Sequence, residues 1–378
     1  MKKKIKILFL IDQLLPGGTE KQLILLVEHL SRENFLPVIG VLEDSEYNKK
    51  LNLKTPVVIF DSNFKYPFRT IHRLFKITRY LYRERIHILQ SFFNTSTIVG
   101  AFSIVLLKSK PILISTRRNL YHWLEEEPIR FKLVRLTARW SDKILVNSFA
   151  VYEKAISLEA ISRGKMEVIH NAIDINCYNK ISPADAREFL GLNREDFIVG
   201  VVANWRPVKG LTFFLEAAGI IANRYPKVKF ILAGFGPQKE ELVALAKKLK
   251  IDQQTLFLDG QKSVDCIIPA FDIAVQPSLS ESFSNVLLEY MACGKPIVAT
   301  RVGEADRVLK ENKNGLIVNP ADSKLLAEAI IFLYKDPELR KNIGELNRQK
   351  VSGEWTVSKI VNRHEILFQA LKDRHLDE

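Results

Sequence analysis

The sequence contains few cysteines, and they are not arranged to build a site. Its three cysteines, Cys177, Cys266 and Cys293, lie far apart, without C-x-x-C spacing and without the even number that a disulfide framework requires. A structural zinc site and a disulfide scaffold are therefore not expected. This sparse cysteine usage fits a reducing compartment, and we expect a cytoplasmic protein.

The sequence also lacks a hydrophobic run long enough to cross a membrane. Its start, M-K-K-K-I-K-I-L-F-L-I-D, imitates a signal peptide, but Asp12 interrupts the apolar stretch after seven residues and no small-residue cleavage site follows. The next longest run, Ile98–Leu107, has about half the length that a bilayer requires. We expect the first run to form a strand and no helix to span a membrane.

Nucleic-acid motifs are missing as well. No zinc-finger, RNP or helix-turn-helix pattern occurs, which argues against DNA or RNA as a partner. The positive charge is concentrated instead: residues 1–190 contain 30 Lys and Arg against 19 Asp and Glu, a net charge of +11, whereas the remainder contains 26 against 24, a net charge of +2. A basic first half allows an anionic membrane surface or a phosphorylated substrate as partner.

The chain has 378 residues, of which 47% are hydrophobic, and this length favours two domains. Short apolar runs alternate with helical patterns in both halves, which indicates an α/β fold with parallel sheets covered on both faces. A second alternating set begins at Phe197–Val202. Strands of the first half are predicted at Ile5–Ile11, Leu36–Val41, Val57–Phe60, Ile88–Ser91, Ile112–Ser115, Ile144–Val146 and Glu167–Ile169.

The most informative stretch runs from Pro277 to Arg301 and predicts a loop, a helix and a strand. Ser284 can cap a helix whose apolar positions recur at three- and four-residue spacings, and Gly294 can supply its left-handed end. Ile297–Ala299 is a short, fully apolar run, which is typical of a strand buried on both faces of a parallel sheet.

The start of this helix is a predicted binding site. Backbone N–H groups of Asn285, Val286 and Leu287 have no partner within a helix and attract an anion. Glu281 precedes the helix and Glu289 lies one turn inside it, so that one carboxylate can border a phosphate pocket while the other accepts hydrogen bonds from a diol. Together these features describe a site for a nucleotide sugar.

The block S-E-S-F-S-N-V-L-L-E-Y-M-A-C-G-K-P-I-V-A-T, with seven residues between Glu281 and Glu289, resembles the diagnostic element of the retaining family 4 glycosyltransferases of the GT-B fold. The resemblance implies two facing Rossmann-like parallel-sheet domains with the active site in the interdomain cleft. It also implies sugar transfer from a nucleoside diphosphate sugar to a glycan or lipid-linked acceptor, in bacterial cell-surface polysaccharide or glycolipid synthesis.

The domain boundary follows from a second likeness. V-I-H-N-A-I-D, at Val168–Asp174, resembles the family's interdomain crossing, with Ala172 where glycine is usual. We therefore expect an acceptor-binding domain at residues 1–175 and a nucleotide-sugar-binding domain at 176–354. A C-terminal amphipathic helix at about 355–372 is expected to cross back to the first domain.

The resemblance also assigns roles to residues. Relatives place an arginine and a lysine on the diphosphate, in the loop that is N-W-R-P-V-K-G here; the lysine is Lys209, and because Asn204 occupies the usual arginine position, Arg206 takes that role. With Glu281, these two residues are the expected catalytic set. The glycine turns P-G-G-T-E and A-G-F-G-P add to the donor site. The expected donor-binding residues are Gly17, Gly18, Gly236, Phe283, Ser284, Asn285, Val286 and Glu289.

Two positions depart from the family pattern. S-T-R-R-N stands where many relatives carry a histidine near the transferred sugar, so Arg117 and Arg118 become acceptor-side candidates; they either contact an acceptor phosphate or solvate the domain edge. The family's later glutamate is replaced within V-G-E-A-D, where Glu304 or Asp306 can take its place.

Residues Lys65–Arg85 predict a basic aromatic helix with two interpretations. One is a surface that contacts anionic lipid headgroups on the inner face of the cell membrane. The other is a helix packed on the sheet with a solvated charged face. Its basic residues recur at spacings of three and four residues, and apolar residues lie between them. The basic residues are Lys65, Arg69, Arg73, Lys76, Arg79 and Arg83, and the apolar ones are Phe68, Ile71, Phe75 and Tyr82.

No cofactor is expected. The sequence Asp-x-Asp is absent, so the diphosphate lacks the usual paired-carboxylate metal site, and cationic side chains would replace the metal. Two alternatives remain open at this stage. One is a GT-B-like nucleotide-sugar epimerase that acts on the donor alone, and the other is a catalytically inactive peripheral-membrane adaptor.

Overall fold

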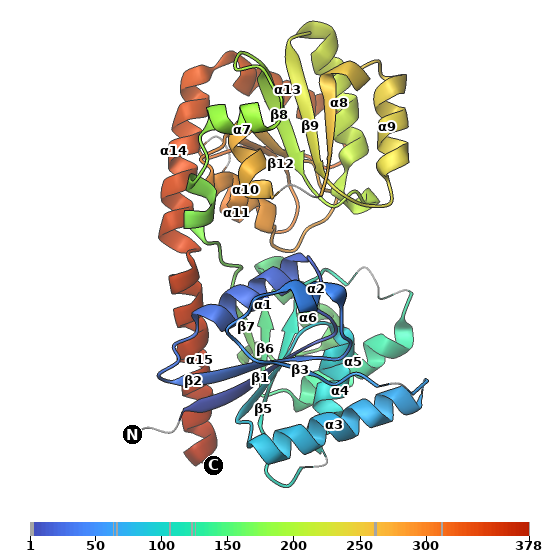
Figure 1. The fold of residues 1–378 in the computed structure, drawn as a ribbon, viewed down its shortest axis with the longest axis vertical. Coiled ribbons are helices and arrows are strands. Elements are labelled where there is room, and N and C mark those ends of the chain that lie inside the picture. Colours follow the sequence, from blue (N-terminus) through green and yellow to red (C-terminus); the bar gives the residue numbers. More distant parts are fainter. Residues whose placement is uncertain are drawn as a thin grey trace. The chain divides into compact units, whose positions relative to one another are not determined.

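The chain forms two compact domains in the computed structural model, which describes residues 4–62, 64–65, 67–105, 107–121, 124, 126–260, 263–310 and 313–377 (Figure 1). The first domain comprises Met1–Ala172 with Val357–Glu378, and the second comprises Ile173–Thr356. Contacts within the chain thus put the first boundary after Ala172, where the sequence suggested residue 175.

The first domain is built on a seven-stranded sheet in the order β3-β2-β1-β4-β5-β6-β7, in which every neighbouring pair is parallel. The predicted strands are confirmed, with shifts of one or two residues at some ends. The strands are β1 (Ile5–Ile11), β2 (Phe35–Val41), β3 (Val57–Ile59), β4 (Ile88–Ser91), β5 (Ile112–Arg117), β6 (Lys143–Val146) and β7 (Met166–Val168).

Helices alternate with these strands, as a parallel sheet requires. Leu8, Leu10 and Leu89 lie in the core beneath them, because strands covered on both faces bury consecutive apolar residues. The helices of this domain are α1 (Gly18–His29), α2 (Glu46–Lys50), α3 (Phe68–Glu84), α4 (Asn94–Val105), α5 (Pro128–Trp140), α6 (Phe149–Glu159) and α15 (Val357–Asp377).

The C-terminal helix α15 packs on the first domain, although the chain reaches it from the second. The ring of Phe368 meets Phe9 and Phe35 edge-on, with centroids 6.1 and 6.0 Å away. Glu365 Oε1 accepts a hydrogen bond from the backbone N–H of Ser31 at 2.7 Å. The helix begins at Val357 rather than at Trp355, because Trp355 ends the preceding helix with a non-helical ψ of 24°.

The second domain is built on a six-stranded parallel sheet in the order β10-β9-β8-β11-β12-β13. Its strands are β8 (Phe197–Val202), β9 (Val228–Gly234), β10 (Thr255–Asp259), β11 (Ile273–Gln276), β12 (Ile297–Thr300) and β13 (Leu316–Val318). Its helices are α7 (Pro183–Phe189), α8 (Leu211–Arg224), α9 (Lys239–Lys248), α10 (Val264–Ile267), α11 (Asn285–Ala292), α12 (Ala305–Val308), α13 (Ser323–Lys335) and α14 (Pro337–Glu354).

Both domains therefore have the Rossmann-like α/β architecture that the sequence predicted. In such sheets ligands bind outside the carboxyl ends of the strands, where the connecting loops gather. Across the described residues, no helix combines the length and the apolar character that a membrane span needs.

Candidate active site

The loop after β8 is fixed in place by a close backbone approach. Gly210 has a φ of +63°, and a Cβ atom there would lie 2.0 Å from the carbonyl oxygen of Pro277, so no side chain fits. The backbone N–H of Leu279 donates to Val208 O at 2.8 Å. Residues 204–210 and 277–284, which the sequence assigned to the same site, therefore meet at the carboxyl edge of the second sheet.

The A-G-F-G-P turn after β9 packs against the same loop. Gly236 has a φ of +155°, and a Cβ atom there would lie 2.4 Å from the carbonyl oxygen of Trp205. The backbone N–H of Trp205 donates to Phe235 O at 2.7 Å. Gly236 thus supports the loop that holds Lys209, which gives this glycine a packing role.

Lys209 and Glu281 form an ion pair at the meeting point of the two loops. Lys209 Nζ donates to Glu281 Oε1 at 2.5 Å, and the side chains are 26% and 14% exposed. Ser278 Oγ donates to the same oxygen at 2.9 Å. Two expected catalytic residues are therefore in direct contact, with a cation and a carboxylate partly open to solvent.

Helix α11 begins at Asn285 and has the predicted cap. Ser284 Oγ accepts a hydrogen bond from the backbone N–H of Leu287 at 3.3 Å. Gly294, beyond the helix, has the expected left-handed φ of +63°. The half-buried residues Ser284, Asn285 and Val286 form the helix start, where the backbone dipoles favour a negatively charged group.

Glu289 lies one turn inside α11 and is only 5% exposed. Its partner is Tyr178, whose phenol forms a hydrogen bond with it. Burial raises the pKa of Tyr178, and the nearby charge of Glu289 raises it further. The Tyr178 hydroxyl therefore stays protonated and holds the Glu289 carboxylate in one orientation.

The other predicted residues of this block have distinct surroundings. Phe283 is buried and packs edge-on against Trp355, with ring centroids 6.1 Å apart. Glu304 is buried too, and its carboxylate lies 3.7 Å from Arg307. Asp306 is instead exposed and pairs with Arg301 at 2.6 Å. Of the two candidates for the family's later glutamate, Glu304 is the one enclosed by the protein.

Arg206 is exposed at the carboxyl end of β8. Its backbone carbonyl accepts a hydrogen bond from the N–H of Lys209 at 2.9 Å, so it directly precedes the turn that carries this lysine. Within the described part of the chain, its guanidinium has no hydrogen bond or ion pair. Arg206 is therefore a cation that a ligand can recruit without breaking an existing contact.

The glycine loop of the first domain, which the sequence assigned to the donor site, contains a carboxylate of its own. Gly17 precedes α1 with extended backbone, and a Cβ atom there would lie 2.3 Å from Glu20 Oε2. Burial raises the pKa of Glu20, against the effect of a hydrogen bond with its own backbone N–H. The Glu20 carboxylate thus lies at the start of α1, which Gly17 and Gly18 form.

Arg117 lies at the end of β5 inside the first domain, not at its edge. Its guanidinium donates to both carboxylate oxygens of Glu159, at 2.7 and 2.9 Å, and the two side chains are 4% and 0% exposed. Tyr121 also donates to Glu159. This contradicts solvation of the domain edge, and Arg117 is already fully paired.

Arg118 is partly buried and donates to the side-chain oxygen of Asn171. Burial lowers its pKa to about 10, while Glu20 opposes the shift. With Thr116, it lines a small pocket bounded also by Gln90 and His364. Arg118 therefore remains the acceptor-side candidate of the first domain.

Sequence reasoning missed the residues that position this site. Ser278 precedes Glu281 by three residues, a local spacing that offered a signal. Thr300 Oγ1 donates to Ser278 O at 2.5 Å, and Tyr178 contacts Glu289 from more than a hundred residues away. No local pattern links these two residues to the site. No group of three or more potential metal-ligating side chains occurs among the residues that the structure describes.

Comparisons with known proteins bear on the family and the fold. A family model described as glycosyl transferases group 1 matches residues 184–350, and one described as glycosyltransferase family 4 matches residues 16–176. N-acetyl-alpha-D-glucosaminyl L-malate synthase of Bacillus anthracis is 30% identical over 251 residues, which are 66% of this chain and 65% of that relative. D-inositol 3-phosphate glycosyltransferase of Mycobacterium sp. (strain JLS) is 31% identical over 205 residues, which are 52% and 46% of the two chains. The matched regions thus span less than two thirds of either relative.

Among solved structures, Anabaena HepE in complex with UDP-glucose superposes with a TM-score of 0.86 at 24% identity, covering 97% of this chain and 100% of HepE. This likeness establishes the fold. The first domain thus matches the family 4 model and the second matches the group 1 model, which identifies the chain as a GT4-like glycosyltransferase with the GT-B fold.

Proposed function

We propose that the chain is a retaining glycosyltransferase that moves a sugar from a nucleoside diphosphate sugar to a glycan or lipid-linked acceptor. The main support is the Lys209–Glu281 pair, which holds a cation and a carboxylate 2.5 Å apart beside the start of α11. In the free protein the two groups neutralise each other. A bound donor would replace this contact with phosphate on Lys209 and a sugar hydroxyl on Glu281.

In the proposed reaction the bond between the anomeric carbon and the diphosphate oxygen breaks, and its electron pair leaves with the diphosphate. Arg206, Lys209 and the start of α11 stabilise this charge, which is the largest available contribution to rate. The acceptor oxygen bonds to the anomeric carbon on the same face, and its proton passes to an oxygen of the departing phosphate. Glu289, oriented by Tyr178, would accept hydrogen bonds from the ribose diol.

The first experiment measures the thermal shift with UDP-, GDP- and ADP-glucose. We expect one nucleotide class to stabilise the protein, and UDP is the first to test because HepE binds UDP-glucose. NMR of the transfer product should then show the anomeric configuration of the donor. An inverted product would contradict the retaining mechanism. Conversion of the donor to its epimer without an acceptor would favour the epimerase, and binding without turnover would favour the inactive adaptor.

We further propose that turnover requires no divalent metal. The support is that Arg206 and Lys209 already bring positive charge to the place where the leaving group departs. Activity should persist in excess EDTA, measured as nucleotide diphosphate released. Loss of turnover that returns only with magnesium or manganese would contradict this proposal.

We place the enzyme on the cytoplasmic side, in synthesis of a cell-surface polysaccharide or glycolipid. All three cysteines are free thiols, which suits a reducing compartment. A second acceptor class is a small soluble anion, favoured by the L-malate and D-inositol 3-phosphate in the names of two relatives and by the cation Arg118. Transfer assays with a lipid-linked sugar and with inositol phosphate distinguish the two classes.

A further inference from the structure

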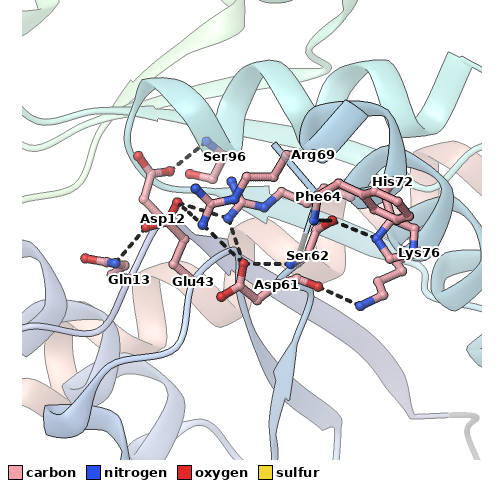
Figure 2. A network of polar contacts seen from close by, with 11 residues as sticks. Asp12, Gln13, Glu43, Asp61, Ser62, Phe64, Arg69, His72, Lys76 and Ser96 are labelled. Carbon is pink, nitrogen blue, oxygen red and sulfur yellow. Dashed lines mark hydrogen bonds and ion pairs between the residues drawn. The ribbon is translucent and has the colours of Figure 1, made fainter. Parts of the chain in front are cut away.

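Several basic side chains of helix α3 are paired with groups of the first domain itself. Arg73 is buried, and its guanidinium lies 3.0 Å from both Glu43 and Asp61. Arg69 lies 2.9 Å from Glu43 and 3.3 Å from Asp61 (Figure 2). Lys76 Nζ donates to the carbonyl oxygen of Asp61 at 2.6 Å. These three residues therefore tie α3 to the loops that follow β2 and β3, and they are not the ones available to an external partner.

The network continues to the carboxyl edge of the sheet. Gln13, just after β1, donates to Glu43 Oε2 at 2.8 Å, and Asp12 accepts from the backbone N–H of Ser96 at 2.7 Å (Figure 2). Burial would raise the pKa of Asp61, but hydrogen bonds from Ser62, Arg73 and Arg69 hold it below its ordinary value. The start of α3 is thus anchored to the edge where ligands bind in parallel sheets.

The outward face of α3 is apolar. Phe68, Ile71, Phe75 and Tyr82 are 66%, 59%, 63% and 76% exposed. Their spacings of three, four and seven residues place them along one side of the helix. Phe64 is exposed too and meets the His72 ring edge-on, with centroids 5.0 Å apart, so it extends this side (Figure 2). We call this surface, formed by Phe64, Phe68, Ile71, Phe75 and Tyr82, the α3 apolar row.

Cations border the α3 apolar row. Arg79 and Arg83 are exposed, and at 100° per residue they lie next to Phe68 and Phe75 around the helix. Glu84 is the single acid of α3, and it lies away from this face, with its carboxylate 3.5 Å from Lys6 Nζ. The outward face therefore combines large apolar side chains with positive charge and contains no negative charge.

We propose that the α3 apolar row, with Arg79 and Arg83, docks on an anionic lipid bilayer. Aromatic and aliphatic side chains can enter the boundary between headgroups and acyl chains, while guanidinium groups contact anionic headgroups. The inference rests on the proposed function, since a docked α3 would hold the carboxyl edge of the first sheet near a lipid-linked acceptor. Charge complementarity favours this occupant over a second copy of the chain, whose outward face would carry the same positive charge.

The test is binding of the full chain to phosphatidylglycerol-containing vesicles and to phosphatidylcholine vesicles at several salt concentrations. Binding should be stronger to the anionic vesicles and should fall as salt screens the charges. Phe68→Ser with Phe75→Ser should weaken binding roughly tenfold or more. Arg79→Gln with Arg83→Gln should weaken it roughly tenfold, and the two variants test the two halves of the surface independently.

Matched controls come from the second domain. Lys247→Gln with Lys248→Gln removes two exposed charges from α9, and Phe332→Ser removes an exposed ring from α13. Neither control should change vesicle binding.

Three outcomes would overturn the proposal: equal binding to both vesicle types, no binding to either, or unchanged binding by both α3 variants. A dimer in vesicle-free solution that Phe68→Ser with Phe75→Ser dissociates would assign the surface to a second copy instead.

The donor assay separates this inference from the proposed function. The α3 variants should keep the thermal shift that a nucleotide sugar gives, because none of the expected donor-binding residues lies on α3. If vesicles bind but no nucleotide sugar stabilises the protein, the proposed function fails and the docking surface stands. If the donor stabilises every variant and vesicles do not bind, the docking surface fails alone.

Discussion

The two domains share one architecture but differ in how their charged side chains are used. In the first domain, arginines near the carboxyl edge form ion pairs with acids of the same domain: Arg117 with Glu159, and Arg69 and Arg73 with Glu43 and Asp61. In the second domain, Arg206 is exposed, and the one acid that pairs with Lys209 among the described residues, Glu281, is itself partly exposed.

This difference shows that net charge does not measure the charge available to a ligand. The first 190 residues have a net charge of +11 and the rest have +2, yet the second domain presents the accessible cations of the expected catalytic set. Arg69, Arg73 and Arg117 are instead committed to ion pairs within the first domain. The part that stays exposed on α3, Arg79 and Arg83, borders an apolar surface rather than a loop site.

The largest expected effect concerns the buried pair of the first domain. Arg117→Met leaves the Glu159 carboxylate, which is 0% exposed, without its cation. Removal of one partner of a buried ion pair costs about 3–5 kcal/mol, so the free energy of unfolding should fall by that amount. Urea denaturation measures it. Adding Glu159→Leu should recover part of the loss, and a single variant as stable as wild type would show that Arg117 is not committed to the fold.

The second domain contains a buried cation, Lys295, that forms no ion pair with a carboxylate in the described part of the chain. Lys295 donates to the carbonyl oxygens of Pro269 and Phe271 at 2.7 and 2.8 Å, and burial lowers its pKa from 10.5 to about 8. Between those two pH values the unfolded chain binds more protons than the folded one, so the free energy of unfolding should rise with pH. The rise amounts to about 3 kcal/mol, at about 1.4 kcal/mol per pKa unit.

Lys295→Met provides the comparison, because every other titrating group remains. The difference between wild type and variant should change between pH 8 and 10.5, in favour of wild type as pH rises. Denaturation at pH 7.5 and 10.5 measures it. A constant difference across this window would mean that Lys295 keeps an ordinary pKa in the folded protein.

The sequence predicted the elements well where local pattern decides them. β1 and β8 have the predicted bounds because their apolar runs are buried on both faces. The cap at Ser284 and the left-handed Gly294 follow from local chemistry in the same way. The prediction was weaker for Arg69 and Arg73, because their partners Glu43 and Asp61 come from earlier loops that only the folded sheet brings close.

In the site too, the sequence did not predict contacts between residues that lie far apart along the chain. The capping residue Ser284 located the helix start, and the resemblance of N-W-R-P-V-K-G to the family's loop located Lys209. The Lys209–Glu281 contact spans 72 residues, and the contact of Tyr178 with Glu289 spans 111. Such pairs depend on which strands neighbour each other in the sheet, which periodicity does not encode.

The accessible cations of the second domain can be tested by activity. Lys209→Ala removes charge from the leaving diphosphate, and turnover should fall roughly a hundredfold or more, by analogy with the loss of an oxyanion donor. Lys239→Ala is the matched control, because Lys239 forms an ion pair of the same 2.5 Å length with Asp259 on an exposed surface. It should leave turnover unchanged. Near-normal turnover of Lys209→Ala would remove this lysine from the mechanism.

The smallest expected effect is that of Arg206→Ala. This variant tests most directly whether cations of the second domain, unlike those of the first, are available to a ligand. Because this guanidinium is exposed and has no partner in the described part of the chain, its loss should change the free energy of unfolding by less than about 0.5 kcal/mol. If it contacts the diphosphate, kcat/KM should fall roughly tenfold, as expected for one charge-assisted hydrogen bond. Arg194→Ala is the control, since Arg194 is also exposed but precedes β8, at the opposite end of the same strand. If Arg206→Ala loses stability but keeps its kcat/KM, then Arg206 stabilises the fold, as the paired arginines of the first domain do. In that case Asn204, at the position where relatives carry the arginine, would be the next residue to replace.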